Sequence, residues 1–171
     1  MIEKIRDYYP INLEKSDKAD SLATSGQPTP KQFSLIAQAG YQAVINLALP
    51  SSTDALVNEG AIVTNLGMVY VHIPVVWEEP KLEDVKLFFE VMDSLKNYRV
   101  WVHCAKNMRV SCFVYLWQKH VLQLPEERAR YPMAEIWQPT GVWQELIAQA
   151  ETNLNLGVTS KDNIAKVISS E

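Results

Sequence analysis

The most constraining stretch of this sequence is an apolar run that stops at a cysteine, turns through polar residues and continues as a helix. The run 100–102 leads to His103 and Cys104, the turn follows, and an apolar helical segment begins near Arg109. A strand that feeds a helix through a short loop surrounds that loop with backbone N–H groups, which favour negative charge. Because a guanidinium adds positive charge at the same place, the stretch predicts an anion site around the Cys104 thiol.

Composition limits the setting of this site. The chain has 171 residues, of which 47% are hydrophobic and 21% charged, as in a single globular domain with a sizeable core. The formal net charge is −4 and the basic residues are scattered, which argues against a nucleic-acid partner. No apolar run approaches the ~20 residues that cross a bilayer, and the N-terminus carries mixed charges instead of a signal peptide. We therefore expect a cytoplasmic protein without a membrane partner, and the oligomeric state stays open.

The two cysteines are expected to be reduced thiols with different roles. Cys104 and Cys112 are separated mostly by predicted helix, which puts their Cα atoms roughly 10 Å or more apart, too far for a relaxed disulfide. Cys112 falls inside a continuous apolar helical segment, where a buried thiol packs like a small hydrophobic residue. Cys104 is thus the cysteine expected to have chemistry.

Hydrophobic periodicity and turn residues predict an alternation of strands and helices. Thr29 is a suitable N-cap with Pro30 at the first helical position, and Thr53 is expected to cap a short helix. The expected strands start at 22 and cover 42–47, 68–74 and 99–103. The expected helices cover 30–39, 54–58, 82–95, 109–122, a segment through 134–137, and 140–152. Residues 1–20 are assigned to an N-terminal extension, 21–152 to the domain and 153–171 to a polar tail.

This alternation predicts a three-layer α/β fold with a mostly parallel central sheet flanked by helices. In such folds function gathers at the carboxyl ends of the strands. Two ends are noteworthy here, the one at His103-Cys104 and the segment 73–80 with its two glutamates.

Each candidate residue also has a plainer structural interpretation. A cysteine or a histidine near a strand end is more often a core residue, but strand, His-Cys, polar loop, arginine and helix in succession favour a functional loop. Glu78 and Glu79 resemble solvated loop carboxylates, and Lys106 a surface lysine. Neither His72 nor His120 has metal-ligand spacing, so we expect neither a metal site nor a cofactor.

Five motifs in order resemble the bacterial dual-specificity/tyrosine-phosphatase-like family, which also occurs fused to metallo-β-lactamase-like hydrolases. The similar segments cover about residues 20–150; they are 25–29 (SGQPT), 44–47 (VINL), 70–75 (YVHIPV), 102–104 (VHC) and 136–143 (IWQPTGVW). The resemblance implies the protein-tyrosine-phosphatase fold and hydrolysis of a phosphate-bearing substrate through a phosphocysteine.

The resemblance also implies roles for residues. Cys104 would be the nucleophile and Arg109 the clamp on the phosphate oxygens. A leaving-group acid is usually an aspartate just after the Ile-Pro-Val segment; this chain has Val76 there, and Glu78 and Glu79 are the nearest carboxylates. The implied phosphate-binding loop comprises His103, Cys104, Ala105, Lys106, Asn107, Met108, Arg109, Val110 and Ser111.

The chain departs from the common tyrosine-phosphatase pattern within this loop. Four residues instead of five separate Cys104 from Arg109, and Asn107 stands at the expected glycine position, which asparagine tolerates because it readily adopts left-handed backbone. At the usual loop length Val110 would occupy the arginine position; a loop shortened by one residue puts Arg109 in place, and we prefer it. Ala48 replaces an arginine that is frequent in the family.

Three functions remain open on this basis. The first is a cysteine-dependent phosphatase with a shortened, degenerate loop and low activity. The second is a catalytically inactive anion-binding or interaction module on the same fold. The third is rhodanese-like transfer of sulfur at Cys104, because sulfurtransferases of that class have a loop of the same length.

Overall fold

The structure, a computed structural model, describes residues 1–13 and 21–154. Its centre is a five-stranded sheet in the order β1-β2-β5-β3-β4. The strands are β1 (Tyr9–Ile11), β2 (Leu22–Ser25), β3 (Ala43–Asn46), β4 (Val69–His72) and β5 (Val100–His103). The pairs β2–β5, β5–β3 and β3–β4 are parallel, and β1 runs antiparallel to β2. The expected mostly parallel three-layer fold is thus confirmed.

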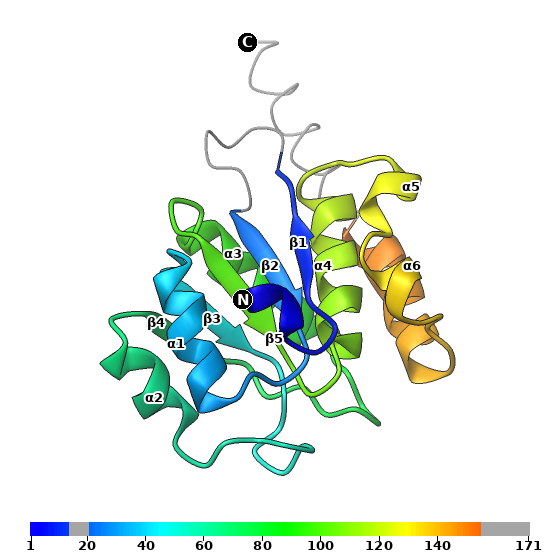
Figure 1. The fold of residues 1–171 in the computed structure, drawn as a ribbon. Helices are drawn as coiled ribbons and strands as arrows, with labels where there is room; N and C mark the ends of the chain where they lie inside the picture. The colour runs from blue at the N-terminus through cyan, green and yellow to red at the C-terminus, as the bar shows by residue number, and fades with distance from the viewer. Residues whose placement is uncertain (14–20, 155–171) are drawn as a thin grey trace, which may run out of the picture.

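Helices connect the parallel strands and cover both faces of the sheet (Figure 1). They are η1 (Ile2–Lys4), α1 (Pro30–Gln38), α2 (Glu59–Asn65), α3 (Leu82–Ser94), α4 (Met108–His120), α5 (Glu126–Ala129) and α6 (Met133–Ile136). Residues 142–154 are also helical. No helix among residues 1–13 and 21–154 combines the length and the apolar character that a membrane crossing requires.

Alternating side chains of the strands divide the core into two clusters. On β5, Val100 and Val102 face a large cluster with α3, α4 and the helix 142–154, whereas Trp101 faces a smaller cluster with α1 and α2. Because Cys104 continues the first alternation and His103 the second, these two neighbours point to opposite sides of the sheet. The site therefore has its thiol on one side and its histidine on the other.

Local sequence signals explain where α1 begins. The Thr29 hydroxyl accepts a hydrogen bond from the Gln32 amide at 3.3 Å, and the Gln32 side chain accepts one from the Thr29 amide at 2.9 Å. Pro30 occupies the first turn, where its missing N–H costs nothing. The predicted helix start is confirmed.

The predicted helix 54–58 is wrong. Asp54 has a left-handed backbone with φ 62°, which interrupts any helix there, and its carboxylate pairs with Arg6 at 3.2 Å. The helix starts five residues later, at Glu59. Gly60, expected to follow the helix, lies inside it, and a Cβ at this position would come within 3.2 Å of the Tyr70 ring.

The assigned N-terminal extension contains η1 and β1, and β1 pairs with β2 in the register Tyr9 to Thr24. Of the predicted polar tail, 153–171, residues 155–171 lie outside the described residues. The helix that precedes it extends through residue 154.

Among the side chains of the smaller core, Trp101 is the one whose truncation we expect to lower the free energy of unfolding most. It is fully buried, stacks on Tyr8 at 5.4 Å, meets Tyr41 edge-on at 5.0 Å and donates from Nε1 to the Ser25 hydroxyl at 2.9 Å. We expect Trp101→Ala to lower the free energy of unfolding by about 3–5 kcal/mol. Urea denaturation measures this loss.

The control for this experiment is Val57→Ala, which truncates a fully exposed side chain. It should change the free energy of unfolding by less than about 0.5 kcal/mol. A similarly small effect of Trp101→Ala would contradict the interpretation of this cluster as a close-packed core.

Candidate active site

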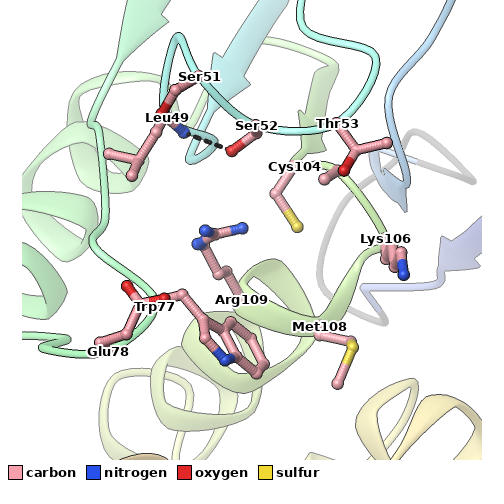
Figure 2. Close-up of a pocket in the computed structure, with 11 residues that line it drawn as sticks. Leu49, Ser51, Ser52, Thr53, Trp77, Glu78, Cys104, Lys106, Met108 and Arg109 are labelled. Atoms are coloured by element: carbon pink, nitrogen blue, oxygen red, sulfur yellow. Dashed lines mark hydrogen bonds between the residues drawn. The ribbon is translucent and has the colours of Figure 1, made fainter.

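The carboxyl end of β5 opens into a pocket of about 400 Å³. Figure 2 shows that the Cys104 sulfur and the Arg109 guanidinium both point into it. Its walls come from the segments after β3, β4 and β5; the lining residues are Leu49, Ser51, Ser52, Thr53, Trp77, Glu78, Cys104, Ala105, Lys106, Met108 and Arg109. The two strand ends noted in the sequence thus meet in one pocket.

The turn after Cys104 is held by an asparagine in left-handed conformation. Asn107 has φ 58° and is the N-cap of α4. Its buried side-chain amide donates to the Asp7 carbonyl at 2.8 Å and to the Thr24 hydroxyl at 2.9 Å. Asparagine therefore provides both the backbone conformation expected of a glycine and two anchors that a glycine lacks.

A close backbone approach fixes the other side of the loop. The Gln27 amide donates to the Ala105 carbonyl at 3.2 Å, and the Gly26 amide donates to the Arg6 carbonyl at 2.9 Å. A Cβ on Gly26 would lie only 2.9 Å from the Ala105 oxygen, so this position needs glycine. The loop is thus supported by the turn after β2 and by the segment after η1.

Arg109 is oriented by two contacts outside the loop. Its Nε donates to the Val75 carbonyl at 2.9 Å, and its guanidinium carbon lies 5.4 Å from the centre of the Trp77 ring. The residue is only 9% exposed, so its charge is directed into the pocket and not into bulk solvent. Arg109 lies beside Cys104 (Figure 2), and Val110 is buried in the core.

A cluster of three tryptophans holds the segment that carries Glu78. The Trp77 ring lies 5.4 Å from Trp137 and 5.0 Å from Trp143, and the Trp143 indole donates to the Trp77 carbonyl at 3.0 Å. The Trp137 indole donates to the Ser111 hydroxyl in the first turn of α4 at 3.1 Å. The cluster therefore connects one wall of the pocket to the helix at its base.

The two carboxylates considered for acid chemistry lie differently. Glu78 lines the pocket. Glu79 is not among the lining residues, and its carboxylate faces Lys81 at 3.9 Å on the surface. Val76, at the usual aspartate position, is 40% exposed. Of the two glutamates, Glu78 is the one that belongs to the pocket wall.

A buried polar cluster lies on the opposite side of the sheet from the thiol. The Glu59 carboxylate accepts from His103 Nε2 at 2.7 Å, Gln27 Nε2 at 2.6 Å, Asn46 Nδ2 at 3.0 Å and the Tyr70 hydroxyl at 3.1 Å. Burial by itself raises the pKa of Glu59, but the donated hydrogen bonds, foremost that of His103, outweigh it and hold the pKa below its ordinary value. Burial raises the pKa of Tyr70 to about 12, so its hydroxyl remains a donor.

The loop residues expected from the sequence divide into two groups. Those that line the pocket are Cys104, Ala105, Lys106, Met108 and Arg109. Those that support it from behind are His103, Asn107, Val110 and Ser111, all buried. Ala48, which replaces a frequent arginine of the family, is buried as well.

Sequence reasoning missed Glu59, Trp77 and the hydroxyl-bearing residues 51–53. The position of Trp77 beside Glu78, in a segment already noted, was the one available signal. Among the described residues no group of three or more histidine, cysteine or carboxylate side chains is arranged to hold a metal ion.

The architecture of the molecule is that of the dual-specificity and tyrosine phosphatases. Chains of the dual-specificity and tyrosine-phosphatase fold superpose on it. Kinase-associated phosphatase with its catalytic-site cysteine changed to serine matches at a TM-score of 0.69 and 11% identity, over 84% of this chain and 93% of that one. A structure of PTPMT1 in complex with PI(5)P matches at a TM-score of 0.67 and 14% identity. The match covers 80% of this chain and 94% of that one. At these identities the likeness concerns the fold.

Sequence comparison identifies the family. The family model described as DSP-PTPase phosphatase fused to NAD+ kinase matches residues 7–152, and the chain belongs to this family. The DUF442 phosphatase candidate from Shewanella putrefaciens CN-32 is 40% identical, with a TM-score of 0.75 over 90% of this chain and 96% of that one. No match is found among the curated proteins. The resemblance to dual-specificity phosphatases noted in the sequence is confirmed.

Proposed function

We propose that this protein is a cysteine-dependent phosphatase that hydrolyses a phosphomonoester through a phosphocysteine at Cys104. The observation that carries the proposal is the convergence of the Cys104 sulfur and the Arg109 guanidinium on one pocket at the N-terminus of α4. α4 has 13 residues, and its N-terminal amides and dipole favour an anion at this place.

The proposed reaction has two steps. The Cys104 thiolate attacks phosphorus, the S–P bond forms, and the bond from phosphorus to the leaving oxygen breaks. Arg109 and the loop amides bind the equatorial oxygens, whose charge they stabilise in the transition state. Water then attacks the phosphocysteine, releases inorganic phosphate and restores the thiolate.

Glu78 is the residue we assign to proton transfer in both steps. It protonates the leaving oxygen in the first step and accepts a proton from water in the second. The assignment rests on its place in the pocket wall, where Glu79 does not contribute. The preceding residue, Trp77, is fixed by the tryptophan cluster, which holds this segment at the pocket.

The substrate is expected to carry a phosphate monoester. Arg109 supplies a positive charge at the floor of the pocket, and Trp77, Met108 and Leu49 form an apolar side wall. PTPMT1, which shares the fold, has been solved in complex with PI(5)P. Exposed Lys106 adds positive charge at the rim of the pocket.

The test is release of phosphate from para-nitrophenyl phosphate over a wide pH range, with Cys104→Ser protein as the blank. Activity above that blank is the expected result. Thiocyanate formed from thiosulfate and cyanide without phosphate release would instead establish sulfur transfer. Thermal stabilisation by phosphate with neither activity would establish the anion-binding module.

The role of Glu78 has its own expected result. Glu78→Gln should lower kcat/KM, which reports the first step alone, for an alkyl phosphate such as phosphoserine by about 10²-fold, because an alkoxide is a poor leaving group without an acid. The loss for para-nitrophenyl phosphate should stay below about tenfold, since its phenolate leaves without full protonation. Steady-state kinetics with both substrates measure the difference.

Glu79→Gln is the matched control, because it removes a neighbouring carboxylate that does not line the pocket. It should leave kcat/KM for both substrates within about twofold of the unchanged protein. Equal losses for the two glutamate variants, or no loss for either, would remove Glu78 from the mechanism.

A further inference from the structure

The Glu59 cluster is a buried ionic group that the proposed chemistry does not use. Glu59 is 4% exposed although it starts a short surface helix. A buried carboxylate is costly unless donors surround it, and four side chains donate to this one. Such an arrangement is stable only when the strands that supply the donors hold a fixed relative position.

The donors come from three parallel strands of the sheet and from the turn after the fourth. Asn46 and His103 are the last residues of β3 and β5, Tyr70 lies on β4, and Gln27 lies in the turn just after β2. Glu59 therefore joins β3, β4 and β5, the strands whose following segments form the pocket walls. The two donor atoms nearest to the Glu59 carboxylate are Gln27 Nε2 at 2.6 Å and His103 Nε2 at 2.7 Å.

His103 connects this cluster to the nucleophile through the backbone. An ionised carboxylate only accepts hydrogen bonds, so Nε2 of His103 carries a proton, and this fixes the orientation of the ring. The ring also meets Phe33 edge-on at 5.7 Å. Because His103 and Cys104 face opposite sides of the sheet, the histidine does not touch the thiol; it determines where the strand ends and hence where the thiol is presented.

We propose that Glu59 is a positioning residue of the active site, which acts through His103 to set the place of the Cys104 sulfur relative to the loop amides. The proposal rests on the proposed function for its kinetic consequence. Its geometric content is independent, because the reactivity of the thiol toward an alkylating reagent depends on the same position.

The experiment compares Glu59→Gln with Tyr70→Phe in the full chain. Both remove one hydrogen-bonding feature of the cluster, but Tyr70 lies on β4, which does not carry Cys104. We expect Glu59→Gln to lower kcat for para-nitrophenyl phosphate by about tenfold or more with KM within twofold, since small misplacements of reacting atoms are that costly. Tyr70→Phe should stay within about threefold in kcat.

Alkylation by iodoacetamide at pH 7 is the second readout. Glu59→Gln should slow modification of Cys104 at least threefold, because alkylation requires that the loop present the sulfur to the reagent in the pocket. This measurement needs no turnover. If the unchanged protein shows no phosphatase activity, the proposed function fails while alkylation still decides the role of Glu59.

A double variant tests whether Glu59 acts through His103. Glu59→Gln combined with His103→Gln should be no worse than the poorer single variant, as expected for residues in one pathway. Additive losses, or a folded Glu59→Gln protein with unchanged kcat and alkylation, would overturn the proposal. If Glu59→Gln does not fold by circular dichroism, His103→Gln alone carries the test, with the same expected losses.

Discussion

Cys104→Ser protein is expected to hydrolyse para-nitrophenyl phosphate at least about 10⁴-fold more slowly than the unchanged protein. Removal of a covalent nucleophile abolishes the first step, and a serine hydroxyl without an adjacent base does not replace a thiolate. The pocket keeps Arg109 and the loop amides, so inorganic phosphate should still stabilise the variant against heat. Loss of turnover with retained phosphate binding in Cys104→Ser would show that Cys104 is needed for the reaction and not for binding of the anion.

Cys112 offers a matched control within α4. It is fully buried, burial raises the pKa of its thiol, and it packs in the larger core. Cys112→Ala should retain full activity and lose only stability. If Cys112→Ala were inactive while Cys104→Ser remained active, the nucleophile would be assigned to the wrong cysteine.

Arg109→Lys should lower kcat for the same substrate by about 10²–10³-fold, although the charge is kept. Lysine is a point charge that cannot bind two phosphate oxygens side by side. It also lacks the Nε that donates to the Val75 carbonyl, and its ammonium would not lie over Trp77 as the guanidinium does. Steady-state kinetics and the inhibition constant of inorganic phosphate measure both losses.

Lys106→Gln is the control for charge alone, because Lys106 is an exposed cation at the same pocket. Its effect on kcat should stay within about threefold at physiological salt, where exposed charges are screened. An Arg109→Lys variant that is as active as Lys106→Gln would show that the clamp at this pocket is not Arg109.

The sequence predicted those features that depend on local chemistry. The start of α1 follows from the Thr29 cap and Pro30, and the left-handed backbone of Asn107 follows from the conformational range of asparagine. The parallel sheet follows from the alternation of strands and helices. In each case the signal lies within a few residues of the feature.

Features that depend on distant contacts were not predictable in this way. Glu59 occupies an ordinary helical position, and its burial follows from donors on strands far along the chain. The cation–π contact of Arg109 with Trp77 and the pairing of β1 with β2 have no local signature either. The helix assigned to 54–58 failed because Asp54 has a left-handed backbone conformation, which hydrophobic periodicity does not reveal.

The anchoring of Asn107 by the Asp7 carbonyl has a consequence for the order of assembly. Asp7 and Asn107 are 100 positions apart in the sequence. The turn after Cys104 is therefore complete only after the N-terminal segment has packed against it. Long loops close slowly, whereas helices such as α4 form from neighbours. Formation of this turn in its final geometry therefore reports that the N-terminal segment is in place.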